Sequence, residues 1–347
     1  MVGIVSYGTY IPRYRIKIED IARVWGKDPA EVKGSLGVTE KSVPELDEDA
    51  VTIAIESATR CFAAWTGKPS DIGALFVGSE SHPYAVNPSS TIVGELLGVG
   101  RNYLAADLEF ACKAATAGMQ AIAGLLGSGH ISCGLAIGAD TAQGSPHDVL
   151  EYTTGSGGVA FLLGTKNVAA ELLAFSSYSS DTPDFWRRDG VRYPTHAGRF
   201  TGEPAYFAHV LGASNYLMEK AHIKPSDATY SVFHMPNGRF PRDVARRIGF
   251  TEKQLAPSLV VDRIGNPYSA TCLLGLSAVL DIAAPGQTIF MVSYGSGAGC
   301  DAFYWKVSEG IQYLQTVRKL QHQLVTGQID QKVYITYDQY LRKTSKI

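Results

Sequence analysis

The sequence has few cysteines, few charged residues and no long apolar run. Of its 347 residues, 18% are charged and 45% are hydrophobic, a composition that excludes an intrinsically disordered chain and is typical of a globular protein. No apolar run approaches the roughly 20 residues that a membrane-spanning helix needs. The first residues, MVGIVSYGTYIPRYRI, lack the basic stretch and apolar core of a secretory signal peptide. We therefore expect a cytoplasmic protein.

The five cysteines form an odd, scattered set without a CxxC pair. This spacing argues against a disulfide framework and a structural zinc site, and it suits a reducing compartment. The formal net charge of −2 gives no overall attraction to nucleic acid or to an acidic membrane. The sequence also lacks an HExxH motif and a P-loop. We predict no metal ion and no nucleic acid or membrane partner.

Apolar runs of strand length occur at 3–10, 72–78, 133–139 and 158–163. Such continuous runs lie in sheets that are covered on both faces. Segments with helical spacing separate them, notably 50–65, 88–98 and the run that follows Cys112. This alternation predicts an α/β fold.

The second half repeats the same order, with strand-like segments at 230–233, 258–266 and 287–294 and an apolar helix at 269–283. Glu80 precedes Cys112 by 32 residues, and His234 precedes Asn266 by the same number. Each pair places one polar residue just after a buried strand and a second at the mouth of a helix of small residues. We interpret this as an internal duplication with halves at 1–166 and 167–347, against the alternative of a chance match in spacing.

The tail at 307–347 differs in character from the two halves. IQYLQTVRKLQHQL reads as an amphipathic helix, and VYITYDQYL alternates like an edge strand. We expect this tail to serve packing or partner contact rather than chemistry.

Cys112 lies in LEFACKAATAG, where small residues make up the first turn of a predicted helix. Small side chains leave the sulfur room for a bulky group, and a helix N-terminus favours the thiolate. The alternative is a buried structural cysteine. The local sequence alone leaves both open.

The duplication would bring four side chains to a shared seam, the usual place for a site: Glu80, Cys112, His234 and Asn266. Singly, Glu80 could be a solvated loop acid, His234 a core histidine and Asn266 a turn residue. Together they make chemical sense. A cysteine takes an acyl group, a carboxylate removes a proton alpha to the thioester, and a His/Asn pair holds a carbonyl oxygen.

Five motifs resemble those of the thiolase superfamily and, within it, of the archaeal type of hydroxymethylglutaryl-CoA synthase. They are GSESHP at 78–83, LEFACKAATAGM at 108–119, VFHMPNGRFP at 232–241, IGNPYSA at 264–270 and SYGSGAG at 293–299. Fatty-acid initiating synthases of the superfamily share the Cys, His and Asn, whereas a glutamate at Glu80 marks the hydroxymethylglutaryl branch. The resemblance implies a thiolase-like fold in which two duplicated α/β halves form five αβαβα layers. The glycines at 295–299 lack the GxGxxG spacing of a dinucleotide site.

The resemblance implies that Cys112 attacks acetyl-CoA and becomes acetylated. Glu80 would then remove a methyl proton, and the carbanion would add to acetoacetyl-CoA oriented by His234. Glu80 would protonate the new alkoxide, and water would release 3-hydroxy-3-methylglutaryl-CoA from Cys112. This reaction belongs to the mevalonate route to isoprenoids.

Further residues would bind the substrates. Those expected at the acyl portion are Asn266, Ser296, Thr153 and Thr201. Arg199 and Arg239 are the best candidates for the CoA phosphates, while Arg242, Arg246 and Arg247 either assist or form a solvated helix face. Asp28 and Pro29 match a family segment that approaches CoA.

The CoA thioesters would be substrates, with no separate cofactor. The resemblance also implies a homodimer and a complex with acetoacetyl-CoA thiolase and a zinc-ribbon/OB-fold protein. Two other functions stay open: a decarboxylating or acyl-carrier-dependent condensing enzyme on the same scaffold, and a non-catalytic scaffold subunit of such a complex.

Overall fold

The structure, a computed structural model, describes residues 1–347. Its main sheet has nine strands in the order β11-β12-β13-β8-β1-β7-β6-β4-β5. The first half of the chain contributes β1 (Gly3–Tyr10), β4 (Ile72–Gly78), β5 (Leu104–Leu108), β6 (Cys133–Thr141) and β7 (Ser156–Gly164). The second half contributes β8 (Ala170–Ser179), β11 (Tyr230–Phe233), β12 (Thr288–Gly295) and β13 (Gly299–Val307). The two parts join through a short antiparallel pairing of β1 with β8.

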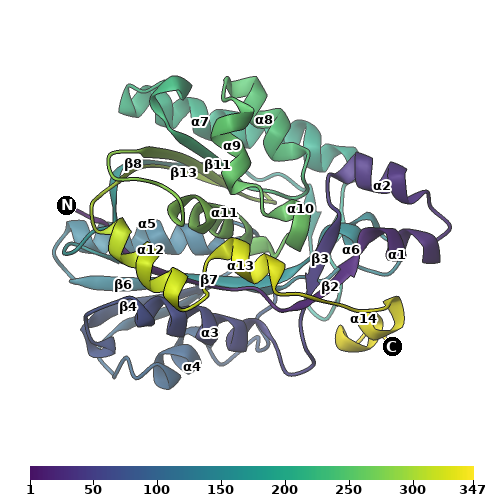
Figure 1. The fold of residues 1–347 in the computed structure, drawn as a ribbon, viewed down its shortest axis with the longest axis horizontal. Coiled ribbons are helices and arrows are strands. Elements are labelled where there is room, and N and C mark those ends of the chain that lie inside the picture. Colours follow the sequence, from purple (N-terminus) through teal and green to yellow (C-terminus); the bar gives the residue numbers. More distant parts are fainter.

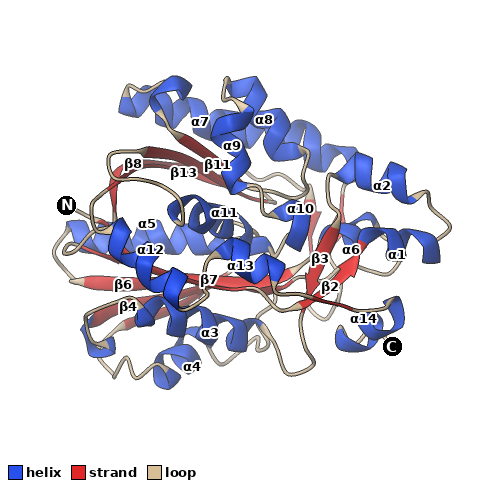
Figure 2. Ribbon diagram, viewed as in Figure 1, coloured by secondary structure: helices blue, strands red, loops and turns tan.

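Helices and the two parts of the sheet alternate in five layers (Figure 1). α7 (Phe207–Ala221) and α8 (Phe240–Ile248) cover the outer face of the second part, and α3 (Ala50–Ala63) and α4 (Ser89–Leu96) cover that of the first. α5 (Ala114–Gly127) and α11 (Thr271–Leu280) lie between the two parts (Figure 2). Every residue of α11 is buried, as its apolar sequence requires of a central helix. The predicted αβαβα arrangement is confirmed.

The two halves share one strand topology. β4 pairs with β6 in parallel, and β6, β7 and β1 follow as antiparallel neighbours. β11, β12, β13 and β8 repeat these pairings in the same order. Only the edge strand β5 has no counterpart. The topology is what an internal duplication produces, while the boundary between 1–166 and 167–347, which falls in the connection from β7 to β8, stays a prediction.

Local signals set the ends of several elements. Asp49 is the N-cap of α3, and its side chain accepts a hydrogen bond from the Thr52 amide. In return, the Thr52 hydroxyl accepts a hydrogen bond from the Asp49 amide, which completes a capping box. α2 (Pro29–Leu36) ends at Gly37 in the left-handed conformation that glycine adopts without strain. The strands expected at 3–10 and 72–78 match β1 and β4 in both bounds.

Two expected strands are wrong. The segment 258–266 contains the helical turn α10 (Val261–Ile264), in which Val261 and Ile264 are buried one turn apart. Its valines suggested a strand, but packing of that helical face overrides their β propensity. In the tail, only β14 (Val333–Tyr334) is extended, and it pairs with β2 (Tyr14–Lys17), itself the neighbour of β3 (Glu40–Val43). The rest forms α14 (Tyr337–Lys343), which a capping box at Thr336 begins.

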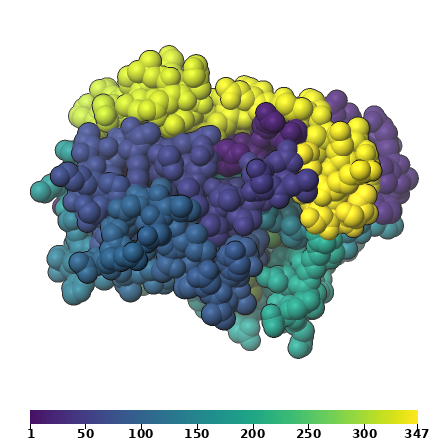
Figure 3. Space-filling view, turned by 90° about the horizontal axis from the view of Figure 1, so that it is seen from below, coloured from purple at the N-terminus to yellow at the C-terminus, as the bar shows by residue number.

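The tail lies along one side of the molecule beside the N-terminal segment (Figure 3). α12 (Ile311–Leu320) buries Ile311 and Leu314 as its pattern predicts, and it ends four residues earlier than expected. α13 (Val325–Asp330) follows it. No helix of the structure is long and apolar enough to cross a membrane.

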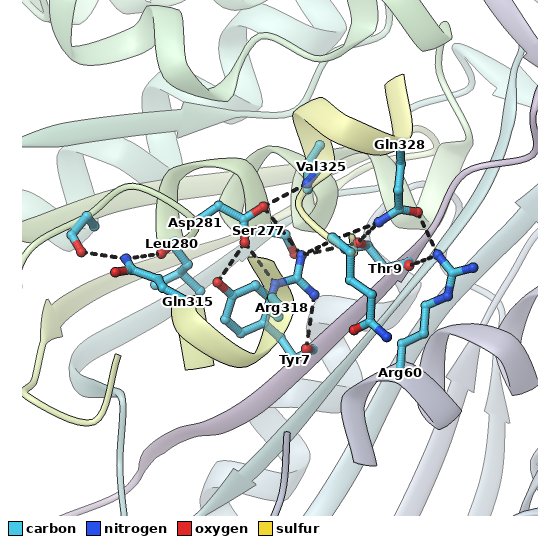
Figure 4. A network of polar contacts seen from close by, with 12 residues as sticks. Tyr7, Thr9, Arg60, Ser277, Leu280, Asp281, Gln315, Arg318, Val325 and Gln328 are labelled. Carbon is cyan, nitrogen blue, oxygen red and sulfur yellow. Dashed lines mark hydrogen bonds and ion pairs between the residues drawn. The ribbon is translucent and has the colours of Figure 1, made fainter. Parts of the chain in front are cut away.

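Arg318 of α12 anchors the tail although its charged side chain is fully buried. Its guanidinium lies 2.8 Å from Asp281, just beyond α11, and donates to the carbonyl oxygens of Tyr7 in β1 and Gln323 in the tail (Figure 4). Asp281 also accepts from the Tyr7 hydroxyl at 2.9 Å and the Val325 amide at 2.8 Å. One buried ion pair therefore joins the tail, the central helix and the central strand.

Replacing Arg318 with methionine should lower the free energy of unfolding by about 3 kcal/mol, because Asp281 is left as a buried charge without its partner. Urea denaturation measures this loss. Lys319→Met is the matched control, since Lys319 is exposed on the same helix, and it should change stability by less than about 0.5 kcal/mol. Equal losses in the two variants would contradict a structural role for the ion pair.

Candidate active site

Cys112 and Glu80 are in contact. Glu80 follows the end of β4, and Cys112 stands in the tight turn that precedes α5, next to Ala111 with a φ of 44°. The Sγ of Cys112 lies 3.4 Å from Oε1 of Glu80 and donates its hydrogen to that oxygen. The first turn of α5 can pack against the strand end because residue 78 is a glycine. A Cβ at that position would lie only 2.3 Å from the Ala115 amide nitrogen. The structure thus brings together two residues predicted to share a site.

The buried side chain of Asp140, at the end of β6, fixes the loop that carries Glu80. Its Oδ1 accepts from the Glu80 amide at 2.8 Å and from the hydroxyls of Ser79 and Ser81 at 2.8 and 2.7 Å. Its Oδ2 accepts from the amide and hydroxyl of Ser269. Sequence reasoning missed Asp140. The available signal was an acidic residue directly after the apolar run 133–139.

Burial sets the protonation of the pair. Loss of hydration raises the pKa of Glu80 to about 8, and the nearby charge of Asp140 adds to the effect. Burial, followed by the charges of Glu80 and Asp140, raises the pKa of the Cys112 thiol well above its usual value. The expectation that the helix N-terminus favours a Cys112 thiolate is therefore wrong. The N-terminus of a helix carries only about half a positive charge. That charge lowers the pKa of the thiol by less than burial and the two neighbouring carboxylates raise it.

His234 follows β11 and is buried. Its amide donates to the carbonyl of Val292 in β12, and its carbonyl accepts from the Tyr206 hydroxyl at 2.7 Å. Burial lowers the pKa of the imidazole to about 3, so the ring is neutral near pH 7. Its Nδ1 has no hydrogen-bond partner within the protein. A neutral ring with a free nitrogen can hydrogen-bond a bound substrate.

Asn266 lies in the turn before α11. Its backbone N–H donates to the backbone carbonyl of Thr153 at 2.6 Å, and its side-chain oxygen accepts a hydrogen bond from the Thr271 hydroxyl. The hydroxyl fixes the carboxamide so that its NH₂ group is left to donate elsewhere. The backbone contact ties Asn266 to Thr153, two residues that the sequence analysis placed at the acyl portion.

A cavity of about 630 Å³ opens beside this seam. Three predicted residues line it, namely Thr153, Arg199 and Thr201. A smaller cavity of about 230 Å³ adjoins it, because Leu36 and Val149 line both. The smaller one is lined by Lys27, a cation that the sequence analysis did not single out. The two cavities together fit a long, thin ligand with an anionic end.

Five predicted binding residues do not line these cavities: Asp28, Pro29, Arg239, Asn266 and Ser296. Asp28 caps α2 through the amides of Ala30 and Glu31, and Pro29 is the first residue of that helix. Arg239 donates from Nε to the carbonyl of Gly34 at 2.9 Å, which joins α8 to α2. Their roles toward a ligand stay predictions.

Ser296 lies in the turn between β12 and β13, where Gly295 pairs with Gly299. Asp184, also missed from sequence, holds this turn, because its carboxylate accepts from the Gly297 amide at 2.7 Å and the Tyr294 hydroxyl at 2.8 Å. No sequence motif marks Asp184.

The three further arginines of the α8 region each pair with a carboxylate. Arg242 contacts Asp262 at 2.6 Å, Arg246 contacts Asp243 at 3.3 Å, and Arg247 contacts Glu203. None of them lines the cavities described above. Nor does the structure hold a cluster of three or more His, Cys, Asp or Glu side chains suited to a metal ion.

Comparison with known proteins decides the family. The chain is 54% identical over 347 residues to the hydroxymethylglutaryl-CoA synthase of Archaeoglobus fulgidus, covering 100% of this chain and 99% of that protein. It is 53% identical over 346 residues to that of Methanopyrus kandleri, with coverages of 100% and 98%. The chain belongs to the hydroxymethylglutaryl-CoA synthase family. As a member of that family it is an acyl-transferring enzyme.

Solved structures agree with this membership in hydroxymethylglutaryl-CoA synthases. MvaS in complex with 3-hydroxy-3-methylglutaryl coenzyme A superposes with a TM-score of 0.91 at 26% identity, covering 99% of this chain and 91% of that one. An HMG-CoA synthase complexed with CoA, at 21% identity and a TM-score of 0.89, covers 99% and 90% and has the same fold. The family model of the 3-Oxoacyl-[acyl-carrier-protein (ACP)] synthase III C terminal matches residues 218–307.

Glu80→Gln should stabilise the fold at alkaline pH. A carboxyl group whose pKa rises from 4.5 to about 8 on folding destabilises the folded state progressively as pH increases between these values. We expect the variant to exceed the wild type by about 4 kcal/mol in unfolding free energy at pH 8, and by about 1 kcal/mol at pH 5. Thermal unfolding at both pH values measures the difference.

The control for this prediction is Glu309→Gln, because Glu309 is exposed. It should leave the melting temperature unchanged at both pH values. A destabilised Glu80→Gln at pH 8 would contradict the assigned burial of the Glu80 carboxylate.

Proposed function

We propose that this chain condenses acetyl-CoA with acetoacetyl-CoA and water to form 3-hydroxy-3-methylglutaryl-CoA and CoA, through an acetyl group on Cys112. The observation that carries the proposal is the 3.4 Å contact between Sγ of Cys112 and the carboxylate of Glu80. A nucleophile next to a half-buried base allows the bound acyl group to be deprotonated at its methyl carbon. The family membership fixes the reaction to which this pair is suited.

The first step transfers the acetyl group. As Sγ attacks the thioester carbonyl of acetyl-CoA, Glu80 accepts the thiol proton along the hydrogen bond already present. The carbon–sulfur bond of acetyl-CoA then breaks, and the departing CoA sulfur takes that proton from Glu80. Because the Cys112 thiol is protonated in the resting site, it depends on Glu80 for activation.

The second step forms the carbon–carbon bond. Glu80 removes a methyl proton from acetyl-Cys112, the enolate adds to the C3 ketone of acetoacetyl-CoA, and the alkoxide takes the proton back. A base with a pKa of about 8 is far stronger than an ordinary carboxylate and is still partly ionised near neutral pH. Neutral His234 would orient the second substrate, while Asn266 and Ser296 would donate to carbonyl oxygens that gain charge.

CoA would occupy the two adjoining cavities. Its pantetheine arm fits the larger one beside Thr153 and Thr201, and its phosphates would pair with Arg199, Lys27 and Arg239. Asp28 and Pro29 lie next to Lys27 in sequence and would bound this end of the site. No separate cofactor enters the proposed reaction.

The wider setting is also proposed. We expect a homodimer, and β5 supports it, because this edge strand has one free side and its Leu104 is 52% exposed. A complex with acetoacetyl-CoA thiolase and a zinc-ribbon/OB-fold protein, cytoplasmic location and the mevalonate route stay predictions. The Cys112–Glu80 contact argues against a silent scaffold subunit, which has no use for an activated thiol.

Incubation with acetyl-CoA should acetylate Cys112. Mass spectrometry of the peptide that contains Cys112 measures the modification. Cys133→Ala should acetylate as the wild type does, because Cys133 lies at the start of β6, away from Glu80, whereas Cys112→Ala should not acetylate. A folded wild-type protein whose Cys112 stays unmodified would refute the proposed function.

The condensation rate should rise with pH as one titration step, the limb of the pH profile, with its midpoint near pH 8. The reason is that Glu80 must be ionised to remove the methyl proton. Glu80→Ala should lower acetoacetyl-CoA-dependent CoA release by about 10²–10⁴-fold and abolish this limb. Steady-state kinetics across pH measure both effects. An unchanged limb in the alanine variant would assign the titration to another group and would favour an acyl-carrier-dependent or decarboxylating enzyme.

A further inference from the structure

A second cavity, of about 260 Å³, opens onto Glu80. It lies between the loop after β4 and the hairpin of β9 (Phe185–Trp186) and β10 (Thr195–His196). It shares no lining residue with the larger substrate cavity. Phe185 and His196 of the hairpin line the substrate cavity, whereas Arg187, Arg192 and Pro194 line this one. The hairpin therefore separates two cavities, and Glu80 lines the smaller of them.

Two buried polar atoms in the wall of this cavity have no hydrogen-bond partner, Nε2 of His82 and Oε1 of Gln143. The His82 side chain is 6% exposed, and its Nδ1 lies 2.8 Å from the Ser89 hydroxyl. The ring is thus fixed from one side, and its buried Nε2 has no partner within the protein. Buried polar groups without partners are rare in proteins and commonly mark a place for water or a bound molecule.

The cavity also holds a cation close to Glu80. Arg187 donates to the backbone carbonyl of Glu80 at 3.3 Å and to that of Val191 at 3.2 Å. It forms no ion pair, although its charge acts to lower the pKa of the nearby Glu80 carboxyl. Arg192, by contrast, has both terminal nitrogens bound to the carbonyls of Thr344 and Ser345. Arg187 is therefore the group in this cavity that can bind an anion.

The proposed reaction needs such a place. After condensation, the product is joined to Cys112 by one thioester and to CoA by another, so pantetheine fills the substrate cavity while the Cys112 bond is cleaved. The attacking water must reach the thioester by another path. Cleavage also creates a carboxylate beside Cys112. A cavity of about 260 Å³ is large enough for several water molecules at roughly 30 Å³ each.

We propose that this cavity is a hydrolysis pocket, in which His82 and Gln143 hold the water that cleaves the Cys112 thioester and Arg187 binds the carboxylate that forms. The proposal rests on the function proposed above. The water oxygen bonds to the thioester carbon, and the carbon–sulfur bond breaks with its electron pair going to Sγ. One water proton returns to Sγ, and the other is released when the new carboxylic acid ionises.

Arg187→Gln tests the pocket, with Arg188→Gln as the matched control, because Arg188 is the neighbouring exposed arginine and does not line the cavity. Each enzyme is mixed with acetyl-CoA and acetoacetyl-CoA and quenched in acid, and intact-protein mass spectrometry follows the species on Cys112. Arg187→Gln should acetylate at the wild-type rate, accumulate the covalent condensation product and release 3-hydroxy-3-methylglutaryl-CoA at least about tenfold more slowly. Arg188→Gln should match the wild type.

Gln143→Leu provides a second, nearly isosteric variant that removes the unpartnered oxygen, and it should accumulate the same covalent product. Normal release by both cavity variants, or loss of acetylation together with release, would overturn the hydrolysis pocket. A wild-type enzyme that does not acetylate at all would instead refute the function on which the pocket rests. The two failures are thus distinguished by the wild-type spectrum.

Discussion

Partial burial of the Glu80 carboxylate beside the charge of Asp140 is the constraint on which the site depends. Burial makes Glu80 a strong base, and the same burial keeps the neighbouring Cys112 thiol protonated until a substrate arrives. Both effects require a loop that does not relax toward solvent. Asp140 meets this need, because its two oxygens accept from five donors on the β4 loop and on Ser269. The reactivity of Glu80 and Cys112 therefore comes from their burial and from the loop that Asp140 holds in place, not from unusual residue types.

The five-layered fold delivers this environment by bringing backbone segments unusually close. Side chains at Gly78 and Gly138 would strike the first turn of α5 and the Ser269 carbonyl, so only glycine lets the central helices approach the ends of β4 and β6. α11 in turn starts next to Asn266 and ends at Asp281, where Arg318 fixes it. The ends of β4 and β6, the central helices and the tail are thus linked by direct contacts.

Much of this was predictable because the evidence is local. Continuous apolar runs defined β1 and β4, and the repeated 32-residue spacing predicted that Glu80 and Cys112 share a seam without knowledge of the fold. The state of the thiol was not predictable, since it depends on burial and on Asp140, which is distant in sequence. Asp140, Asp184 and Lys27 act from element ends that carry no motif. The segment 258–266 and the end of the tail were misjudged because their packing partners decide their conformation.

The bond between Arg192 and the carbonyls of Thr344 and Ser345 ties the loop beside Glu80 to the last residues of the chain. The loop beside the catalytic acid is thus held from two directions, by the Glu80 carbonyl that accepts from Arg187 and by the segment after α14 that accepts from Arg192. A change in the segment after α14 would therefore act on the surroundings of Glu80 through this loop, although the two are far apart in the sequence.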